Sequence, residues 1–198
     1  MSAGEMQLMN NNENAWYAIR VTYSREIKLR DYLEEKSIKC FVPMHYEIKT
    51  VRRKKVRELL PVVHNLIFVY STRAILDQIK LMVDSILGMR YMMDKSLKVP
   101  IVIPENEMRN FIMISGTMDE QLEYTSTDRI NLSKNDQVLI TGGVFSGVIG
   151  RVIGTKKKCQ VVVSIPGFIA VITARIDPCL LHKIPKNKHS EGRIIRKD

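Results

Sequence analysis

The stretch over residues 138–152 (VLITGGVFSGVIGRV) constrains the fold more than any other part of the chain, because it sets glycines at short distances between two apolar runs. Gly143, Gly147 and Gly150 suit a positive φ or a close approach of two backbones, which residues with a Cβ disfavour. The pattern predicts a strand, a glycine-rich turn and a second strand. Further short apolar runs follow within residues 133–184, and a segment of that size favours a small five-stranded β-barrel, in which closure removes exposed edges.

Residues 16–115 carry a different pattern, in which runs rich in β-branched and aromatic residues alternate with helical periods. The second helical segment has the clearest period, since its apolar side chains recur every three or four residues from Ile75 to Ile86. The order β-α-β-β-α-β-α predicts an α+β sandwich of ferredoxin-like type. The expected strands are residues 16–22, 39–51 and 66–70, the last within the segment 59–70, with short strands at 87–93 and 99–103. The expected helices begin at the caps Ser24 and Thr72 and at Pro104.

The polar stretch between these two blocks has neither a strand period nor a helix period, which is typical of an interdomain linker. The first residues are polar and rich in Asn and Met, without the basic and apolar regions of a signal peptide. The last residues are basic and predicted to fray. The predicted organisation is a disordered leader (1–15), an N-terminal domain (16–115), a linker (116–132), a β-barrel domain (133–184) and a basic tail (185–198).

The charge of the chain favours a polyanionic partner without requiring one. The 198 residues include 31 Lys and Arg against 21 Asp and Glu, a formal net charge of +10. Residues 1–115 hold 18 basic and 13 acidic side chains, and residues 116–198 hold 13 and 8, so the excess is not confined to one part. A basic protein that binds no polyanion is the open alternative on charge alone. No run of about 18 apolar residues occurs, which excludes an apolar transmembrane helix.

Residue types that carry catalysis or bind metals are scattered along the chain. Cys40, Cys159 and Cys179 are far apart, and Cys179-x-x-His182 is one isolated half of a metal site. An odd number of widely spaced cysteines suits a reducing compartment. The four histidines form no spaced cluster, and the sequence contains no phosphate-binding or dinucleotide loop. We therefore expect a cytoplasmic protein that is not an enzyme and that needs no cofactor or metal.

Two parts of the sequence resemble known modules. The pattern G-x-F-x-G-x-x-G-x-V resembles the KOW module of NusG-like transcription factors and of some ribosomal proteins. It is carried by Gly143, Phe145, Gly147, Gly150 and Val152. Residues 16–20 (WYAIR), 40–44 (CFVPM), and 60–61 with 65–69 (LP and NLIFV) resemble strands of the NusG N-terminal domain. The insertion over residues 62–64 resembles that of UpxY-type paralogues, which antiterminate capsular-polysaccharide operons.

The resemblance implies a transcription elongation and antitermination factor that docks on the β′ clamp helices of RNA polymerase and suppresses pausing or termination. Leu66 departs from relatives that have Tyr at this position. Along a strand, Leu66 and Phe68 share a face opposite to that of Ile67, and the sequence leaves open which face meets the core. The implied polymerase-binding patch consists of Tyr17, Leu60, Pro61, Leu66 and Phe68.

Two basic segments are candidate contacts for nucleic acid of the elongation complex, which is upstream or non-template DNA or nascent RNA. The basic turn is expected to reach phosphates, and the alternative is a charged tip that keeps a hairpin edge soluble. The first helix reads non-template DNA in specialised NusG paralogues, which implies contacts by position here. The candidate residues are Arg52, Arg53, Lys54 and Lys55 in the turn and Arg25, Lys28 and Tyr32 in the helix.

Phe145 is the candidate partner contact of the KOW-like segment. A large apolar side chain in a turn flanked by Gly143 and Gly147 is hard to bury completely, so we expect it at the rim of the barrel. The alternative is that Phe145 fills the end of the barrel. The matching loop of NusG-like proteins meets a ribosomal protein or the termination factor Rho. The competing function is a ribosome-associated or general RNA-binding KOW protein, and in either case we expect a monomer with no membrane partner.

Overall fold

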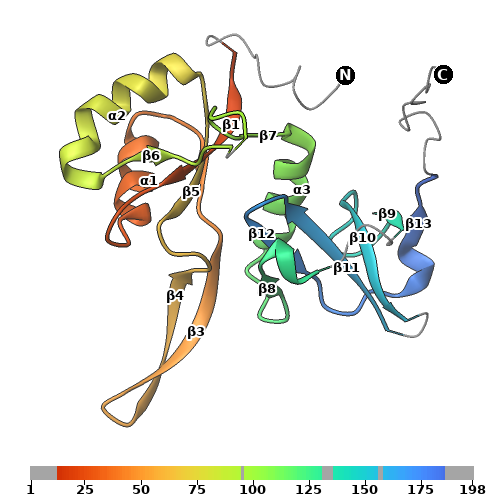
Figure 1. Cartoon of the computed structure of the whole chain (residues 1–198). Helices are drawn as coiled ribbons and strands as arrows, with labels where there is room; N and C mark the ends of the chain where they lie inside the picture. Colours follow the sequence, from red (N-terminus) through yellow and green to blue (C-terminus); the bar gives the residue numbers. More distant parts are fainter. Residues whose placement is uncertain (1–12, 95, 131–135, 156–157, 186–198) are drawn as a thin grey trace, which may run out of the picture.

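The computed structural model describes residues 13–94, 96–130, 136–155 and 158–185. Within these residues, two β-sheets and a separate two-stranded hairpin are accompanied by three α-helices (Figure 1). The structure is therefore a mixed α/β fold, as predicted. The leader and the basic tail that the sequence predicts fall almost entirely outside the described residues.

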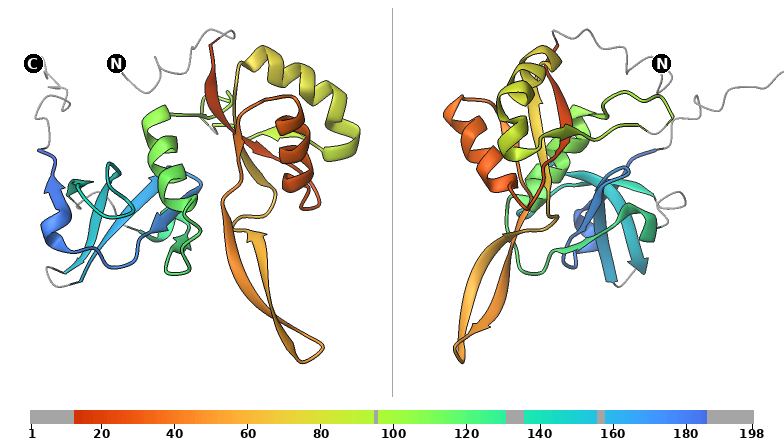
Figure 2. Two further views of the ribbon diagram at one scale, coloured as in Figure 1. Left: turned by 180° about the vertical axis from the view of Figure 1, so that it is seen from behind. Right: turned by 60° about the vertical axis from the view of Figure 1, so that its left-hand side comes forward.

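The first sheet is antiparallel and is centred on the pairing of β1 with β5, in which Ala18 lies opposite Phe68. α1 (Glu26–Glu35) and α2 (Arg73–Leu87) pack on one face, and α3 (Glu105–Ser115) packs on the other (Figures 1 and 2). The strand order is β2 (Cys40–Phe41), β5 (Leu66–Ser71), β1 (Ala15–Arg20) and β6 (Arg90–Tyr91), and β7 (Val102–Ile103) also pairs with β1.

The alternation of side chains along β5 divides the core into two clusters. Ile67 and Val69 join the cluster under α1 and α2. Leu66 and Phe68 join a second cluster, hereafter the junction cluster, which contains residues of α3 and of the second sheet. Both faces of the strand are buried, so each pair meets a core, but a different one.

Helix boundaries follow local side-chain chemistry in part. Thr72 caps α2 as predicted, since its Oγ1 accepts a hydrogen bond from the Ile75 N–H at 3.3 Å. Ser24 does not cap α1. Its φ is +50°, its N–H donates to Asn65 Oδ1 at 2.7 Å, and the helix begins two residues later. Pro104 directly precedes α3 instead of occupying its first position.

β3 (Met44–Val51) and β4 (Lys54–Pro61) form a hairpin that extends away from the first sheet (Figures 1 and 2). The strand predicted over residues 39–51 is broken at Val42 and Pro43, so β2 and β3 belong to different sheets. Pro43 has no N–H to donate to a ladder, and its carbonyl instead accepts a hydrogen bond from the Val62 N–H at 2.8 Å. This bond closes the base of the hairpin.

The second sheet has six antiparallel strands in the order β13-β9-β10-β11-β12-β8. Its end strands, β13 and β8, do not pair with each other in the described part of the chain, so the prediction of a closed five-stranded barrel is wrong. The edge of β12 is occupied by β8, where Tyr124 lies opposite Val171. The bounds are β8 (Glu123–Thr125), β9 (Gln137–Ile140), β10 (Ile149–Thr155), β11 (Lys158–Ile165), β12 (Ile169–Ile172) and β13 (Leu181–Lys183), with 3-10 turns η1 (Thr127–Arg129) and η2 (Pro178–Leu180).

Since β8 comes from the stretch predicted as a linker, the connection between the two sheets is shorter than predicted. We call residues 13–115 the first unit, residues 116–122 the tether and residues 123–185 the second unit. α3 and β5 of the first unit pack against the second sheet, with α3 contacting β11 and β12 (Figure 1). We call this contact the junction.

Candidate functional site

Leu66 and Phe68 lie in the junction. Phe68 is 0% exposed, and its ring packs edge-on against Phe111 of α3, with centroids 6.1 Å apart, and against Phe168 of the second unit, with centroids 6.2 Å apart. Leu66 is also buried. The face of β5 that carries these two side chains, hereafter the Leu66–Phe68 face, is therefore covered, and the second unit contributes to the cover.

The other three predicted polymerase contacts lie elsewhere. Tyr17 is buried in the core under α1 and α2, and its ring packs edge-on against Tyr91 with centroids 5.8 Å apart. Leu60 and Pro61 are half-buried at the base of the hairpin, and the two residues after Pro61 pack against the junction cluster. Leu60 and Pro61 thus lie at the hairpin base, next to residues that pack toward the Leu66–Phe68 face, and Tyr17 lies on the opposite face of the sheet.

Phe145 is buried, contrary to the prediction that it lies exposed at a barrel rim. It is 6% exposed and belongs to the cluster that includes α3, whereas its neighbour Val144 is 78% exposed. The turn folds back on itself, because the Gly147 N–H donates to the Ile140 carbonyl at 2.8 Å and the Val148 N–H to the Phe145 carbonyl at 3.1 Å. The prediction considered the barrel alone, and α3 adds apolar surface that the barrel alone lacks.

The glycines of the motif have the structural roles that the sequence predicts. Gly147 has φ +88°, as the turn requires, and Gly143 also has a positive φ. A Cβ on Gly150 would lie 2.4 Å from Val161 Cγ1 and 2.7 Å from the Val162 carbonyl oxygen, so β10 and β11 approach closely at this point. Val152, half-buried against the junction cluster, pairs with Val161. These residues build the sheet and do not form a ligand site.

The tip of the hairpin presents four cations to solvent. Arg52 and Arg53 form its two-residue turn with φ +50° and +64°, and Lys54 and Lys55 begin β4. All four side chains are exposed, and no ion pair joins any of them to another residue in the described ranges. The tip is therefore available for phosphate groups.

Cations nearer the base of the hairpin have partners. Lys49 Nζ lies 2.9 Å from a carboxylate oxygen of Glu58 on the neighbouring strand. The Arg57 guanidinium lies 3.7 Å above the Tyr46 ring and pairs with Glu120 of the tether at 2.7 Å. Arg57 thus links the hairpin to the tether, and the free charge is concentrated at the tip.

The nucleic-acid candidates of the first helix form a separate surface. The Arg25 guanidinium donates to the Ile86 carbonyl and lies 5.2 Å above the Tyr23 ring. Lys28 is exposed, and the half-buried Tyr32 directs its hydroxyl at the sulfur of Met82. The hairpin tip points away from α1 and α2, so the structure does not bring the two basic segments together (Figure 1).

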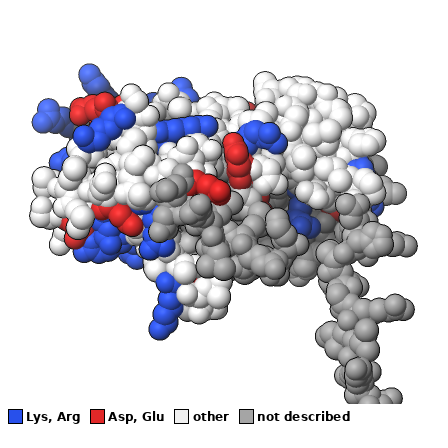
Figure 3. All heavy atoms as spheres, turned by 90° about the horizontal axis from the view of Figure 1, so that it is seen from above, with Lys and Arg blue, Asp and Glu red and all other residues white. Residues whose placement is uncertain are grey.

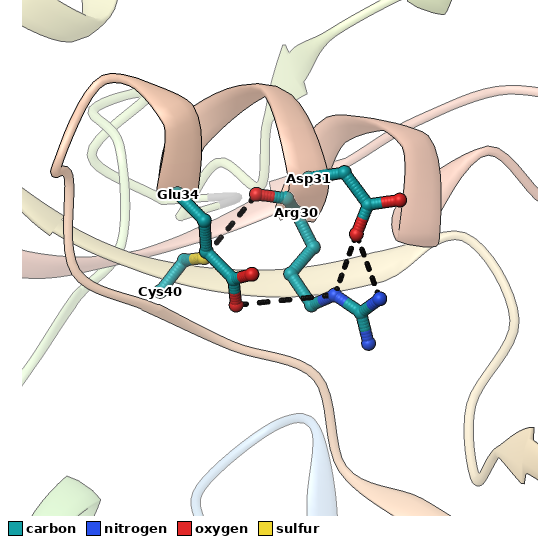
Figure 4. A network of polar contacts seen from close by, with 4 residues as sticks. All are labelled: Arg30, Asp31, Glu34 and Cys40. Atoms are coloured by element: carbon teal, nitrogen blue, oxygen red, sulfur yellow. Dashed lines mark hydrogen bonds and ion pairs between the residues drawn. The ribbon is translucent and has the colours of Figure 1, made fainter.

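Arg30, also on α1, is engaged by its own helix. Its guanidinium donates to Asp31 Oδ1 at 2.7 Å and lies 3.9 Å from Glu34 Oε1 (Figure 4). The Cys40 thiol lies beside this network and contacts the Arg30 carbonyl oxygen at 3.9 Å. Burial, and next the nearby Glu34 carboxylate, raise the pKa of the Cys40 thiol to about 11, so it is not a thiolate nucleophile at neutral pH.

Charge on the upper face of the molecule is mixed. Seen from above, basic and acidic side chains are interspersed at the end that carries α1 and α2, without a continuous basic surface (Figure 3). Such a distribution favours local contacts with nucleic acid over a long electrostatic track.

Exposed apolar residues near α1 and α2 were not predicted from the sequence. Tyr23 is 84% exposed in a loop with φ +57°, and α2 leaves part of its apolar stripe uncovered. The predicted segment is helical, but only part of its apolar stripe, such as Leu76 and Ile79, is buried against the sheet. The exposed apolar residues of α2 are Ile75, Leu81, Met82 and Ile86.

No group of three or more His, Cys, Asp and Glu side chains in the described residues could hold a metal ion. Of the helices in the described part of the chain, none has the length and apolar character needed to cross a bilayer.

Comparison with known proteins places the chain in a family. Residues 14–112 match the family model "NusG: Transcription termination factor nusG". No curated protein matches the chain. Among solved structures, the chain is similar to the one described as "Domain interaction in Thermotoga maritima NusG", with 18% sequence identity and a TM-score of 0.42. The match covers 89% of this chain and 100% of that chain. Because the family model spans half of its length, the chain belongs to the NusG family.

Proposed function

We propose that this chain is a transcription elongation and antitermination factor that binds RNA polymerase through the Leu66–Phe68 face and the adjoining hairpin base. Members of the NusG family are transcription factors, not enzymes, and bind RNA polymerase. The observation that carries the proposal is the double burial of β5. One face packs under α1 and α2 of its own unit, whereas the other is covered in part by a unit held on a short tether.

Opening of the junction uncovers the part of this rigid apolar strand face that Phe168 and the second sheet cover, while Phe111 of α3 stays against Phe68. Aromatic side chains in such positions contribute most of the binding energy of many protein interfaces. Phe68 is the anchor of this proposed interface, with Leu66 beside it and Leu60 and Pro61 at its border. The β′ clamp helices of RNA polymerase are the proposed partner, and suppression of pausing or termination is the proposed outcome.

The hairpin tip adds an electrostatic contact to this proposal. Its four exposed cations lack ion-pair partners in the described residues and stand at the far end of the hairpin. Each phosphate neutralised there releases counterions, so binding by the tip is salt-dependent. Upstream DNA is the proposed ligand of the tip, and non-template DNA is the proposed ligand of Arg25, Lys28 and Tyr32.

Selectivity for particular operons, such as capsular-polysaccharide loci, is a further part of the proposal. It rests on the resemblance of residues 62–64 to an insertion of UpxY-type paralogues. Val62 and Val63 pack against the junction cluster, and exposed His64 lies 3.6 Å from the buried Glu26 carboxylate. The insertion therefore borders the proposed polymerase contact. The KOW identity of the second unit, with a ribosomal protein or Rho as its partner, is likewise proposed.

Two aromatic residues that touch each other across the junction give the test. Phe68→Ala removes the proposed anchor, and we expect binding of the full chain to core RNA polymerase to weaken at least about 10-fold. Phe168→Ala removes its partner in the second unit, which loosens the junction, and we expect polymerase binding to strengthen. Affinity is measured with immobilised core polymerase, and circular dichroism checks that both variants are folded.

The matched control is Ser85→Ala, an exposed position on α2. Folded Phe68→Ala protein that binds polymerase as the wild type does would contradict the proposal. Purification with ribosomes, and not with polymerase, would support the ribosome-associated alternative instead.

A further inference from the structure

A polar cavity of about 210 Å³ lies in the junction between α3 and the second sheet. Asn110 ties its two sides together, because its Oδ1 accepts a hydrogen bond from the Ile149 N–H at 3.3 Å. The walls of the cavity therefore separate if the junction opens. Its polar lining residues are Asn106, Glu107 and Asn110 from α3 and Gln137, Arg151 and Ser164 from the second unit.

Glu107 is poorly matched to this cavity. Its Oε2 atom is buried and has no hydrogen-bond partner. Burial raises the pKa of the Glu107 carboxyl, and no neighbouring charge contributes to that shift. The hydroxyl groups of Ser115, at the end of α3, and Tyr124, on β8, are also buried, but these two groups lie beside each other and interact. The junction thus combines an apolar centre with an unsatisfied carboxylate oxygen near the N-terminal end of α3.

Few other charged groups face Glu107. On α3, Glu105 and Arg109 are exposed, and the second sheet presents Arg151 to the cavity. β12 consists of Ile, Ala and Val, and β1 presents Trp16 and Ala18 to this side of the sheet. Burial raises the pKa of the Tyr124 phenol, so this group stays neutral at acidic and neutral pH. Glu107 is therefore the carboxyl group among the polar residues that line the cavity, and burial holds its pKa above the ordinary value.

We propose that Glu107 keeps the junction reversible, because closure moves its carboxylate from water into a cavity that offers Oε2 no partner. Glu107 is half-buried, and ionisation is disfavoured where one carboxylate oxygen is buried without a partner. At neutral pH this cost opposes the apolar contacts of Phe68 and Phe168 and maintains a population of open molecules. The inference concerns the junction itself, and its consequence for polymerase access rests on the proposed function.

The direction of the pH dependence follows from the raised pKa. The closed form binds the Glu107 proton more tightly than the open form, so low pH favours closure. The closed population falls as pH rises from the ordinary range of glutamate, about 4.3, through the raised pKa of the closed form. Above that pKa the closed population is constant with respect to this group.

The experiment measures closure of the full chain without polymerase, so its failure is distinct from failure of the proposed function. Fluorescent labels are placed on exposed Cys179 and on Cys introduced by Ser85→Cys, and single-molecule energy transfer counts closed and open molecules. Cys159 is buried and Cys40 is half-buried with a pKa of about 11, so both react slowly. The variants are Glu107→Gln, which keeps the shape, and Glu107→Met, a second neutral side chain.

We expect the wild type to open as pH rises and Glu107→Gln to lose this dependence. At pH values above the raised pKa, Glu107→Gln should increase the ratio of closed to open molecules roughly 10-fold. Glu105→Gln makes the same charge change at an exposed position of α3 and should match the wild type. A wild type that stays closed at every pH, or neutral variants that keep its pH profile, would overturn the proposal.

Discussion

Two turns of this protein lie in opposite environments. The turn between β9 and β10 carries Gly143 and Gly147 at positive φ and buries Phe145 in the junction. The turn between β3 and β4 has Arg52 and Arg53 at positive φ and stands free in solvent. The first turn has glycine where the backbone needs it, whereas the second places long cationic side chains in a conformation that costs residues other than glycine free energy.

The difference indicates that the residue types at a turn reflect whether the turn packs against the protein or faces solvent. Glycines let the β9–β10 turn fold back and direct an aromatic ring inward, which stabilises the junction. Arginines at the hairpin tip give up local backbone stability and present charge, which is useful where a polyanion is the partner. The comparison predicts that changes in the first turn affect stability and that changes in the second affect binding.

The largest expected effect is that of Phe145→Ala. Truncation of a buried aromatic ring leaves a cavity, and we expect the free energy of unfolding to fall by about 3–5 kcal/mol. Thermal and urea unfolding of the full chain measure this change. Val144→Ala, at the exposed neighbour, should change stability by less than about 0.5 kcal/mol. Equal stability of the two variants would contradict the assignment of a stabilising role to the buried Phe145 ring.

The next effect concerns binding by the hairpin tip. Replacing Arg52, Arg53, Lys54 and Lys55 by Gln removes the four cations without ion-pair partners in the described residues. The slope of log K against log salt for association with an elongation complex should become shallower by about 0.7–0.9 for each phosphate that the tip no longer neutralises. Lys49→Gln with Glu58→Gln, which removes a paired cation and its partner, is the control and should leave the slope unchanged. An unchanged slope in the fourfold variant would show that the tip serves solubility.

The smallest expected effect is that of Arg53→Gly, which tests the backbone strain of the hairpin turn. Arg53→Gly replaces a residue at φ +64° by one that tolerates this conformation, and we expect the hairpin to gain about 1 kcal/mol of local stability. Hydrogen exchange of the β3 and β4 amides measures the gain. Polymerase-complex binding should weaken slightly because one cation is removed. A hairpin that exchanges faster in Arg53→Gly than in the wild type would contradict the assignment of strain to this turn.

Features decided within a few residues were predictable from the sequence. Thr72 caps α2 because the chemistry of a cap is local, and Gly147 adopts a positive φ because the turn demands it. The alternation of Leu66 and Phe68 against Ile67 also follows from strand geometry. Membership in the NusG family, implied by the resemblance of the N-terminal segments, is confirmed by the family model.

Features decided by distant contacts were not predictable. Phe145 is buried in a cluster that also contains residues of α3, more than twenty residues earlier in the chain, and Phe68 packs in part against Phe168. β8 has a short polar sequence that becomes a strand because β12 offers an unpaired edge. Ser24 has the side chain of a helix cap, but its backbone N–H donates to Asn65 Oδ1 in the loop before β5 and the helix begins later. In each case a tertiary partner decided between local alternatives.

The tether has a consequence for competition between partners. It consists of the seven residues between Ser115 of α3 and Glu123 of β8, so even fully extended it spans at most about 25 Å. A unit held on so short a connection is present near its binding face at an effective concentration in the millimolar range.

Any molecule that binds the Leu66–Phe68 face competes with this internal ligand, and its apparent affinity falls by the fraction of molecules that are open. Strong intrinsic binding then yields only moderate occupancy in dilute solution. If the hairpin tip binds DNA as proposed, the DNA concentrates the protein locally and offsets this reduction, and the two proposed binding regions are then coupled through local concentration.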